Sequence, residues 1–250
     1  MSARSMIRRL TLFVGLSTIA DAVAAQARPG TADDDIRALP LHIVPTKATP
    51  PMALAIVLSG DGGWAGIDRR IASDLTARGI GVVGLDSRSY LMKARTPDEI
   101  SADIGHVINH FTTEWAVQRI ALVGYSRGAD MAPFIANRLP RAVRDQLALI
   151  ALLAPAERAS FQFHWADLLA ETSRPSDIPI LPELERLRGT PVLCVYGTQE
   201  KESLCRLADT AAVRVDGRKG RHHFDGDYDA IAAEIIQQLT PLDARRPAGT

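Results

Sequence analysis

The sequence lacks an excess of charge of either sign, because 29 Lys and Arg residues balance 29 Asp and Glu residues. A nucleic-acid-binding domain usually carries a strongly basic surface, so this balance argues against nucleic acid as a partner. Low-complexity tracts and internal repeats are also missing, and 46% of the residues are hydrophobic. A chain of 250 residues with this composition is expected to form one globular domain with a proper core.

Long hydrophobic runs are scarce, and the run at residues 10–20 is too short for a confident membrane span. Arginines precede this run, and a stretch of small residues follows it at 22–27. Basic, then apolar, then small residues are typical of a secretory signal peptide. We therefore expect residues 1–27 to be a cleaved signal peptide and residues 28–250 to be a single exported domain. An uncleaved membrane anchor is the alternative.

Cysteine is nearly absent, with only Cys194 and Cys205 in the chain. An even number of cysteines with a short loop between them predicts a disulfide in an oxidising compartment. Such a bridge would contribute about 2–3 kcal/mol to stability. The alternative is a buried free Cys194 in a strand and an unrelated Cys205.

Short apolar runs alternate with helical patterns over most of the chain. We expect strands at residues 53–58, 80–85, 120–123, 147–153, 192–196 and 212–215. This alternation predicts an α/β fold with a mostly parallel sheet and helices on both faces. Ligands on such sheets bind beyond the carboxyl ends of the strands. Residues 156–189 are expected to form a lid-like insertion, whose aromatic residues at 161–165 would contact a membrane surface, line an acyl pocket or pack against the main domain.

The most informative motif is Gly-Tyr-Ser-Arg-Gly at residues 124–128, between an apolar run and a helical pattern. A strand, a Gly-x-Ser-x-Gly motif and a helix in this order predict a nucleophile elbow, the sharp turn of an α/β-hydrolase fold. The turn strains the serine backbone, so its neighbours two positions away must lack bulky side chains. We therefore expect Ser126 to be a nucleophile.

A serine nucleophile needs a base, and the base needs an orienting acid. In an α/β-hydrolase the chain order is serine, acid, histidine. Glu200 follows the predicted strand at 192–196 and is the expected acid, with Glu202 as the alternative. His223 precedes the last helix, next to an anchoring phenylalanine, and is the expected base, with His222 as the alternative. A metal site at these histidines is disfavoured, because adjacent residues of an extended segment point to opposite sides.

An oxyanion hole requires two backbone N–H donors. We expect one from Arg127, directly after the nucleophile, and one from Asp61 in the glycine-rich loop at 60–63. A phosphate-binding loop is a weaker interpretation of this segment, because no Lys-Ser or Lys-Thr follows it.

With these residues assembled, the chain resembles the family of the bacterial virulence protein VirJ and the C-terminal part of AcvB. The matching segments are residues 59–64, Asp86-Ser87 with Tyr90, 95–99, 124–133 with 137–140, 194–205 and 222–228. The resemblance implies an α/β-hydrolase-like protein of the periplasm. AcvB-type proteins are associated with hydrolysis of lysyl-phosphatidylglycerol, and VirJ-type proteins with type IV secretion substrates. Arg127 departs from the apolar residue expected after the serine in this family.

The resemblance predicts a serine hydrolase that cleaves an aminoacyl ester on a lipid headgroup at the membrane surface, with no cofactor or metal. A lysyl headgroup is cationic, so Asp61 and Asp130 are candidate ammonium-binding residues. The alternative for each is structural, with Asp130 pairing with a neighbouring Arg and Asp61 capping the next helix. Two other functions remain open. One is an escort protein for type IV secretion substrates without catalysis, and the other is a general secreted carboxylesterase acting on neutral esters.

Overall fold

The computed structural model describes residues 36–165 and 174–240, and the predicted signal peptide lies outside them. Its centre is a seven-stranded sheet with the strand order β1-β3-β2-β4-β5-β8-β9. Only β1 runs antiparallel to its neighbour, so the sheet is mostly parallel, as predicted. The strands are β1 (Leu41–Val44), β2 (Ala53–Leu58), β3 (Ile80–Leu85), β4 (Ile120–Tyr125), β5 (Leu147–Leu153), β8 (Val192–Gly197) and β9 (Arg214–Arg218).

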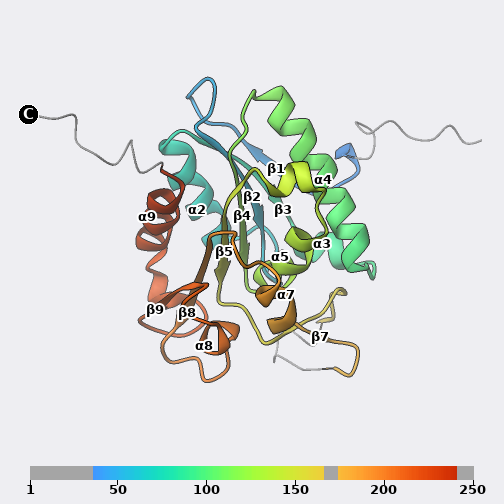
Figure 1. The fold of residues 1–250 in the computed structure, drawn as a ribbon, viewed down its shortest axis with the longest axis vertical. Helices are drawn as coiled ribbons and strands as arrows, with labels where there is room; N and C mark the ends of the chain where they lie inside the picture. The colour runs from blue at the N-terminus through green and yellow to red at the C-terminus, as the bar shows by residue number, and fades with distance from the viewer. Residues whose placement is uncertain (1–35, 166–173, 241–250) are drawn as a thin grey trace, which may run out of the picture. The chain divides into compact units, whose positions relative to one another are not determined.

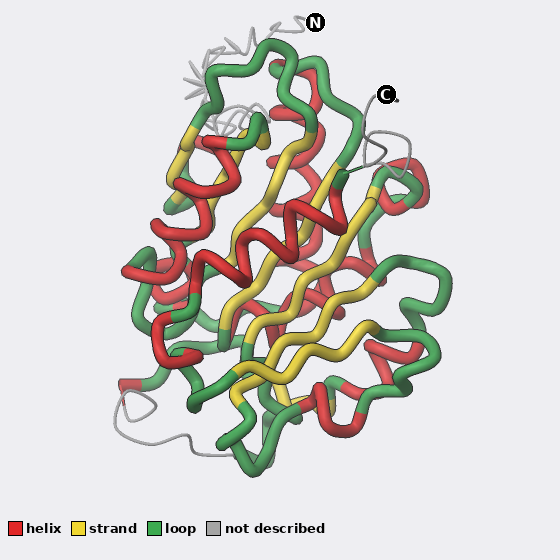
Figure 2. Tube along the Cα trace, turned by 90° about the vertical axis from the view of Figure 1, so that its left-hand side faces the viewer, coloured by secondary structure: helices red, strands yellow, loops and turns green. Residues whose placement is uncertain are grey.

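Helices cover both faces of this sheet (Figure 1). On one face lie α2 (Gly66–Ala77) and α9 (Tyr228–Leu239), and on the other α4 (Pro97–Glu114) and α5 (Arg127–Arg138). Figure 2 views the sheet from the side of α2 and α9, with helices in front of the strands. The shorter elements are α3 (Ser87–Leu91), α6 (Arg141–Arg144), α7 (Leu181–Glu185), α8 (Leu204–Leu207) and the 3-10 turn η2 (Phe224–Gly226).

The central strands are apolar throughout because both of their faces are buried. In β2, Leu54, Ile56 and Leu58 pack into the core under α4 and α5. The intervening residues, Ala53, Ala55 and Val57, pack into the core under α2 and α9. A sequence run of uniform hydrophobicity therefore serves two separate cores, one on each side of the sheet.

The register of the parallel strands brings their carboxyl ends to one edge. Leu58 at the end of β2 lies opposite Gly124 of β4. Tyr125 lies opposite Leu153 of β5, which in turn lies opposite Val195 of β8. The loops that follow β2, β4, β5 and β8 are therefore neighbours at this edge.

The last strand differs from the prediction at 212–215, because β9 begins at Arg214 and ends at Arg218. As the edge strand it pairs only with β8, so polar residues are tolerated in it. The apolar Val213 lies before the strand and is buried. The predicted strand therefore begins two residues before β9 begins and ends three residues before β9 ends.

Within the predicted lid-like insertion, the described residues form the two-stranded antiparallel sheet β6 (Arg158–Ala159) and β7 (Ile178–Pro179), followed by α7. Part of this insertion, residues 166–173, lies outside the described residues. Phe161 and Phe163 are buried and belong to the core on the side of α4 and α5, whereas Trp165 is 62% exposed. No helix among the described residues is both long and apolar enough to cross a bilayer.

The predicted disulfide is present and joins Cys194 in β8 to Cys205 in α8. The bridge closes the loop that follows β8 onto the strand that carries it. Both cysteines are buried. The alternative with two free cysteines is therefore wrong.

Asp68 near the start of α2 is a buried carboxyl group whose surroundings disfavour its charge. One oxygen, Oδ2, accepts a hydrogen bond from the Ala65 N–H at 3.1 Å, and Oδ1 is buried without a partner. Burial, with a smaller contribution from the nearby Asp86 charge, raises the pKa of Asp68 from 3.8 to about 6. The folded state therefore binds this proton more tightly than the unfolded state does.

The raised pKa of Asp68 predicts that the stability of the fold depends on pH. The tighter binding of the proton by the folded state stabilises the fold fully below about pH 4, and this contribution is lost as the pH rises through 6. The difference between 3.8 and about 6 corresponds to about 3 kcal/mol. Asp68→Asn removes the titration and keeps an acceptor for the Ala65 N–H. We expect the unfolding free energy of this variant, relative to wild type, to increase by up to about 3 kcal/mol between pH 4 and pH 7.5 in urea titrations. An identical difference at both pH values would contradict the burial argument.

Candidate active site

Ser126 occupies a strained turn between β4 and α5. Strand β4 ends at Tyr125 and helix α5 begins at Arg127, so Ser126 alone makes the turn. Its backbone has φ 51° and ψ −120°, a conformation that costs a non-glycine residue about 1–3 kcal/mol. Its N–H donates to the Leu153 carbonyl at the end of β5, at 2.8 Å. The turn therefore has the form of the predicted nucleophile elbow.

The two glycines of the motif are required by close backbone contacts. A Cβ on Gly124 would lie 2.4 Å from the carbonyl carbon of Gly128. A Cβ on Gly128 would lie 2.1 Å from the carbonyl oxygen of Leu58 at the end of β2. The predicted need for small residues on either side of Ser126 is confirmed. The first turn of α5 packs directly onto the ends of β2 and β4.

The glycine-rich loop after β2 lies against the nucleophile. A Cβ on Gly60 would lie 3.1 Å from the Ser126 Cβ, so only glycine allows this approach without displacement. The loop turns through a hydrogen bond from the Gly63 N–H to the Gly60 carbonyl, at 3.0 Å. Its single side chain, that of Asp61, makes an ion pair with Arg127. The structure thus brings both predicted oxyanion residues together beside Ser126.

Glu200 contacts His222. Its Oε1 lies 2.9 Å from His222 Nδ1, and its Oε2 accepts a hydrogen bond from the Gly197 N–H at 2.8 Å. Both side chains are largely buried, with exposed fractions of 15% for Glu200 and 28% for His222. An acid on Nδ1 fixes the ring orientation and leaves Nε2 as the second ring nitrogen. The alternative acid, Glu202, is exposed.

His223, the histidine favoured by the sequence argument, makes a different contact. Its Nδ1 lies 2.7 Å from the Tyr125 hydroxyl, and the residue is exposed. The predicted pair Glu200–His223 is therefore replaced by Glu200–His222. The predicted anchor Phe224 is fully buried, but it adopts φ 52°. This left-handed backbone changes the chain direction, so proximity to the anchor does not tell which ring faces the acid.

The acid loop and the histidine loop are hydrogen bonded to each other. The Thr198 N–H donates to the Arg218 carbonyl at 2.7 Å, and the Gln199 N–H donates to the Gly220 carbonyl at 3.0 Å. From α8, the Arg206 guanidinium donates to the carbonyls of Thr198 and Glu200, both at 3.0 Å. The disulfide holds α8 to β8. Together these contacts fix the carboxylate of Glu200 relative to His222.

Tyr125 is a site residue that the sequence analysis missed. Its hydroxyl contacts His223 Nδ1 and donates to the His222 carbonyl at 3.3 Å. Its ring centroid lies 5.4 Å from that of His222. The residue before the nucleophile therefore connects the elbow to the histidine loop. The sequence does contain a signal for this role. Tyr125 places a hydroxyl at the end of an otherwise apolar strand, in a chain that also has two adjacent histidines.

The two aspartates expected to bind a substrate ammonium group already have protein partners. Both carboxylate oxygens of Asp61 contact Arg127. Asp130 is 5% exposed, and its Oδ1 accepts a hydrogen bond from the Ala156 N–H at 2.8 Å. The Asp130 contact ties α5 to the loop after β5. Among the described residues, no group of three or more His, Cys, Asp or Glu side chains is arranged to hold a metal ion.

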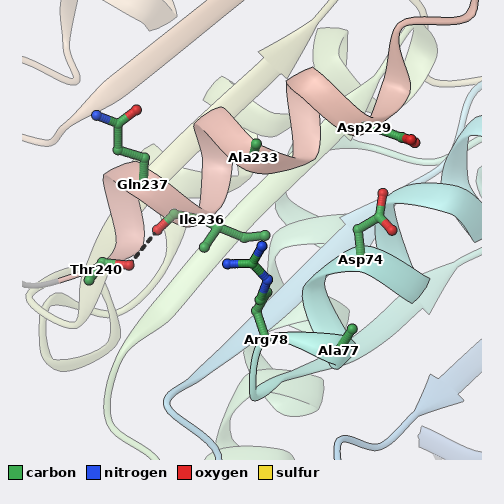
Figure 3. Close-up of a pocket in the computed structure, with 8 residues that line it drawn as sticks. All are labelled: Asp74, Ala77, Arg78, Asp229, Ala233, Ile236, Gln237 and Thr240. Atoms are coloured by element: carbon green, nitrogen blue, oxygen red, sulfur yellow. Dashed lines mark hydrogen bonds between the residues drawn. The ribbon is translucent and has the colours of Figure 1, made fainter. Parts of the chain in front are cut away.

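A pocket of about 450 Å³ lies between α2 and α9 (Figure 3). It is lined by apolar and charged side chains of the two helices, including Asp74, Arg78, Asp229 and Ile236. None of the candidate site residues described above lines it. We therefore place the candidate active site at the carboxyl edge of the sheet and not in this pocket.

Comparison with known proteins agrees with this architecture. The family model described as "Bacterial virulence protein (VirJ)" matches residues 52–242, which is most of the chain and includes every residue of the site. Among curated proteins, no sequence matches the chain significantly.

Many solved structures share the fold at low sequence identity. Est1E from Butyrivibrio proteoclasticus aligns with a TM-score of 0.56 and 17% identity over 80% of this chain and 93% of its own. A lipase-esterase related protein from Clostridium acetobutylicum gives a TM-score of 0.54 and 18% identity over 79% of this chain and 99% of its own. MenH from S. aureus aligns with a TM-score of 0.56 and 12% identity over 80% of this chain and 97% of its own. The chain therefore has the α/β-hydrolase fold, as predicted.

Gly197 provides a test of the coupling between the two loops. A Cβ on Gly197 would lie 2.3 Å from the Arg221 carbonyl oxygen, so Gly197→Ala must push the acid loop and the histidine loop apart. We expect a loss of about 1–3 kcal/mol in unfolding free energy, measured by urea denaturation. Gly66→Ala is the matched control, because nothing lies within 4 Å of its added Cβ. Equal stability of the two variants would contradict this close approach.

Proposed function

We propose that this chain, which belongs to the family of the bacterial virulence protein VirJ, hydrolyses an ester bond through Ser126, His222 and Glu200. The observation that carries the proposal is the 2.9 Å contact between Glu200 Oε1 and His222 Nδ1 in a fold that holds Ser126 in a strained elbow. Serine, acid and histidine follow β4, β8 and β9, in the chain order of α/β-hydrolases. The resemblance to esterase structures supports the fold, and the acid–histidine pair supports the chemistry.

The proposed reaction has two steps. In the first, Ser126 Oγ attacks the ester carbonyl while His222 Nε2 accepts the hydroxyl proton, and the collapsing intermediate expels the alcohol, which takes that proton. In the second, His222 removes a proton from water, and the resulting attack releases the acid and regenerates Ser126. Glu200 holds the imidazole in one tautomer and stabilises its charged form in both steps.

The negative charge that develops on the carbonyl oxygen requires two hydrogen-bond donors. Arg127 is the first residue of α5, where a backbone N–H has no partner within the helix. The positive end of the helix dipole also lies there. The second donor in this proposal is the Asp61 N–H, from the loop that lies against Ser126. Removal of one such donor typically slows a reaction by about 10²–10³-fold.

We propose an aminoacylated phospholipid such as lysyl-phosphatidylglycerol as the substrate. The support is the resemblance to AcvB-type proteins over most of the chain. The leaving group is then a glycerol hydroxyl of the lipid headgroup, and the acyl group on Ser126 is lysine. The substrate would be presented at a membrane surface on the periplasmic side. The disulfide between Cys194 and Cys205 supports an oxidising compartment.

A neutral ester is the second candidate substrate, and one observation favours it. The carboxylate of Asp61 is neutralised by Arg127, and that of Asp130 is buried in a hydrogen bond to the backbone. Neither of the two expected ammonium-binding groups therefore presents an unpaired charge. A general carboxylesterase would show no preference for cationic acyl groups.

The proposal predicts which side chains are essential for catalysis. We expect Ser126→Ala and His222→Gln to reduce kcat by at least about 10³-fold, and Glu200→Gln by about 10²–10⁴-fold. His223→Gln is the matched control, because that ring contacts Tyr125 and not the acid. It should retain kcat within about tenfold. The assay measures lysine release from lysyl-phosphatidylglycerol in mixed micelles, beside hydrolysis of p-nitrophenyl acetate.

The outcomes separate the alternatives. Lysine release by wild type but not by Ser126→Ala supports the aminoacyl-lipid hydrolase. Activity on p-nitrophenyl acetate alone supports the general esterase. If folded wild type cleaves neither substrate, the chain acts as a binding protein, and an escort of type IV secretion substrates becomes the better proposal. A larger loss in His223→Gln than in His222→Gln would overturn the assignment of the base.

A further inference from the structure

The ion pair between Asp61 and Arg127 joins the two segments that flank the nucleophile. Arg127 Nε lies 3.1 Å from Asp61 Oδ1, and Arg127 Nη2 lies 2.9 Å from Asp61 Oδ2. Two parallel bonds between a guanidinium and a carboxylate fix orientation as well as distance. The Arg127 side chain is 10% exposed and that of Asp61 is 20% exposed. Solvent therefore screens this pair less than a surface ion pair.

Both residues of the ion pair lie next to the nucleophile. Arg127 directly follows Ser126, and its backbone is fixed by the first turn of α5. Asp61 directly follows Gly60, whose α-carbon lies against Ser126. These are the two residues whose N–H groups face the developing oxyanion in the proposed reaction. Their side chains bind each other, so one contact sets the distance between the two donors.

The loop contains a single side chain that can hold it in place. Residues 60–63 are Gly-Asp-Gly-Gly, so Asp61 has the only side chain of the segment. A Cβ added to Gly62 would have nothing within 4 Å. Glycine-rich segments have high conformational entropy, and a loop donor must be positioned before the reaction to be effective. A link from Asp61 to the rigid helix supplies that positioning.

We infer that the Asp61–Arg127 ion pair is a clamp that positions the loop donor of the oxyanion hole. This inference rests on the proposed esterase function and assigns both side chains a positioning role in it. The guanidinium and the carboxylate do not touch the reacting atoms. They hold the glycine loop at the distance from α5 at which both N–H groups reach one oxygen. The clamp also explains how a charged residue is accommodated directly after the nucleophile.

The clamp predicts a loss in kcat without a comparable change in KM. Asp61→Asn keeps the shape of the side chain but removes its charge and one of its two acceptors. We expect kcat on p-nitrophenyl acetate to fall about 10–100-fold, with KM within about twofold. Arg127→Met should have the same effect. The double variant should lose no more than either single variant, because both break one interaction.

Asp229→Asn is the matched control. It breaks a bidentate pair of the same chemistry, between Arg70 Nε and Nη2 and the Asp229 carboxylate at 2.6 and 2.7 Å, on helices α2 and α9. Its kcat and KM should equal those of wild type. Additive losses in the Asp61→Asn and Arg127→Met double variant, or an effect on KM alone, would overturn the clamp. An effect on KM alone would indicate that the ion pair contacts the substrate.

Hydrogen exchange tests the clamp independently of any activity. The peptide spanning residues 59–64 should exchange several-fold faster in Asp61→Asn than in wild type or Asp229→Asn. Unchanged exchange would overturn the clamp even in an active enzyme. Wild-type protein that cleaves no ester would refute the proposed function instead, and faster exchange in Asp61→Asn would still support the clamp.

Discussion

The close approach of α5 to the ends of β2 and β4 is the constraint on which the site depends. There is no room for a side chain at Gly124 or Gly128, because either Cβ would lie within 2.4 Å of backbone atoms. The chain turns from β4 into α5 at Ser126, whose backbone has a positive φ of 51°. The cost of that backbone is offset by packing of the strand and the helix, both of which are buried. The strain holds the hydroxyl at the end of the sheet.

Around this rigid turn, polar contacts hold the loops that carry the remaining groups. The clamp between Asp61 and Arg127 holds the glycine loop on one side. Backbone hydrogen bonds between the loops after β8 and β9, with the disulfide, hold Glu200 and His222 on the other. Tyr125 contributes a contact from the strand end to the histidine loop. Sheet and helices thus provide rigidity, while a few directional contacts set the geometry of flexible segments.

Those features of the fold that follow from local physics could be predicted from the sequence. Continuous apolar runs located β2, β3 and β5 with the bounds that the structure has. The start of α4 also follows from local residues, because Thr96 caps the helix, Pro97 is its first residue, and Thr96 and Glu99 form a complete capping box. The motif at 124–128 identified the elbow because few residue types satisfy its backbone.

Other features depend on contacts that sequence patterns do not encode. The choice between His222 and His223 depends on tertiary contacts, because His222 Nδ1 lies 2.9 Å from Glu200 Oε1 whereas His223 Nδ1 lies 2.7 Å from the Tyr125 hydroxyl. The pairing of Asp61 with Arg127 joins positions 66 residues apart in the chain. Nothing beside Asp61 in the sequence indicates this partner, so its carboxylate is a candidate ligand for a substrate ammonium group until the fold is known. The short helix α3 lacks the periodicity that identifies longer helices.

The most direct test of the central claim is the structure of the protein after reaction with an alkyl fluorophosphonate. The phosphonyl group imitates the tetrahedral intermediate, and its oxygen occupies the position of the oxyanion. We expect a covalent bond from phosphorus to Ser126 Oγ, with the phosphonyl oxygen about 3 Å from the N–H groups of Asp61 and Arg127 and with His222 facing Ser126. An unlabelled Ser126, or an adduct whose oxygen points away from both N–H groups, would contradict the account.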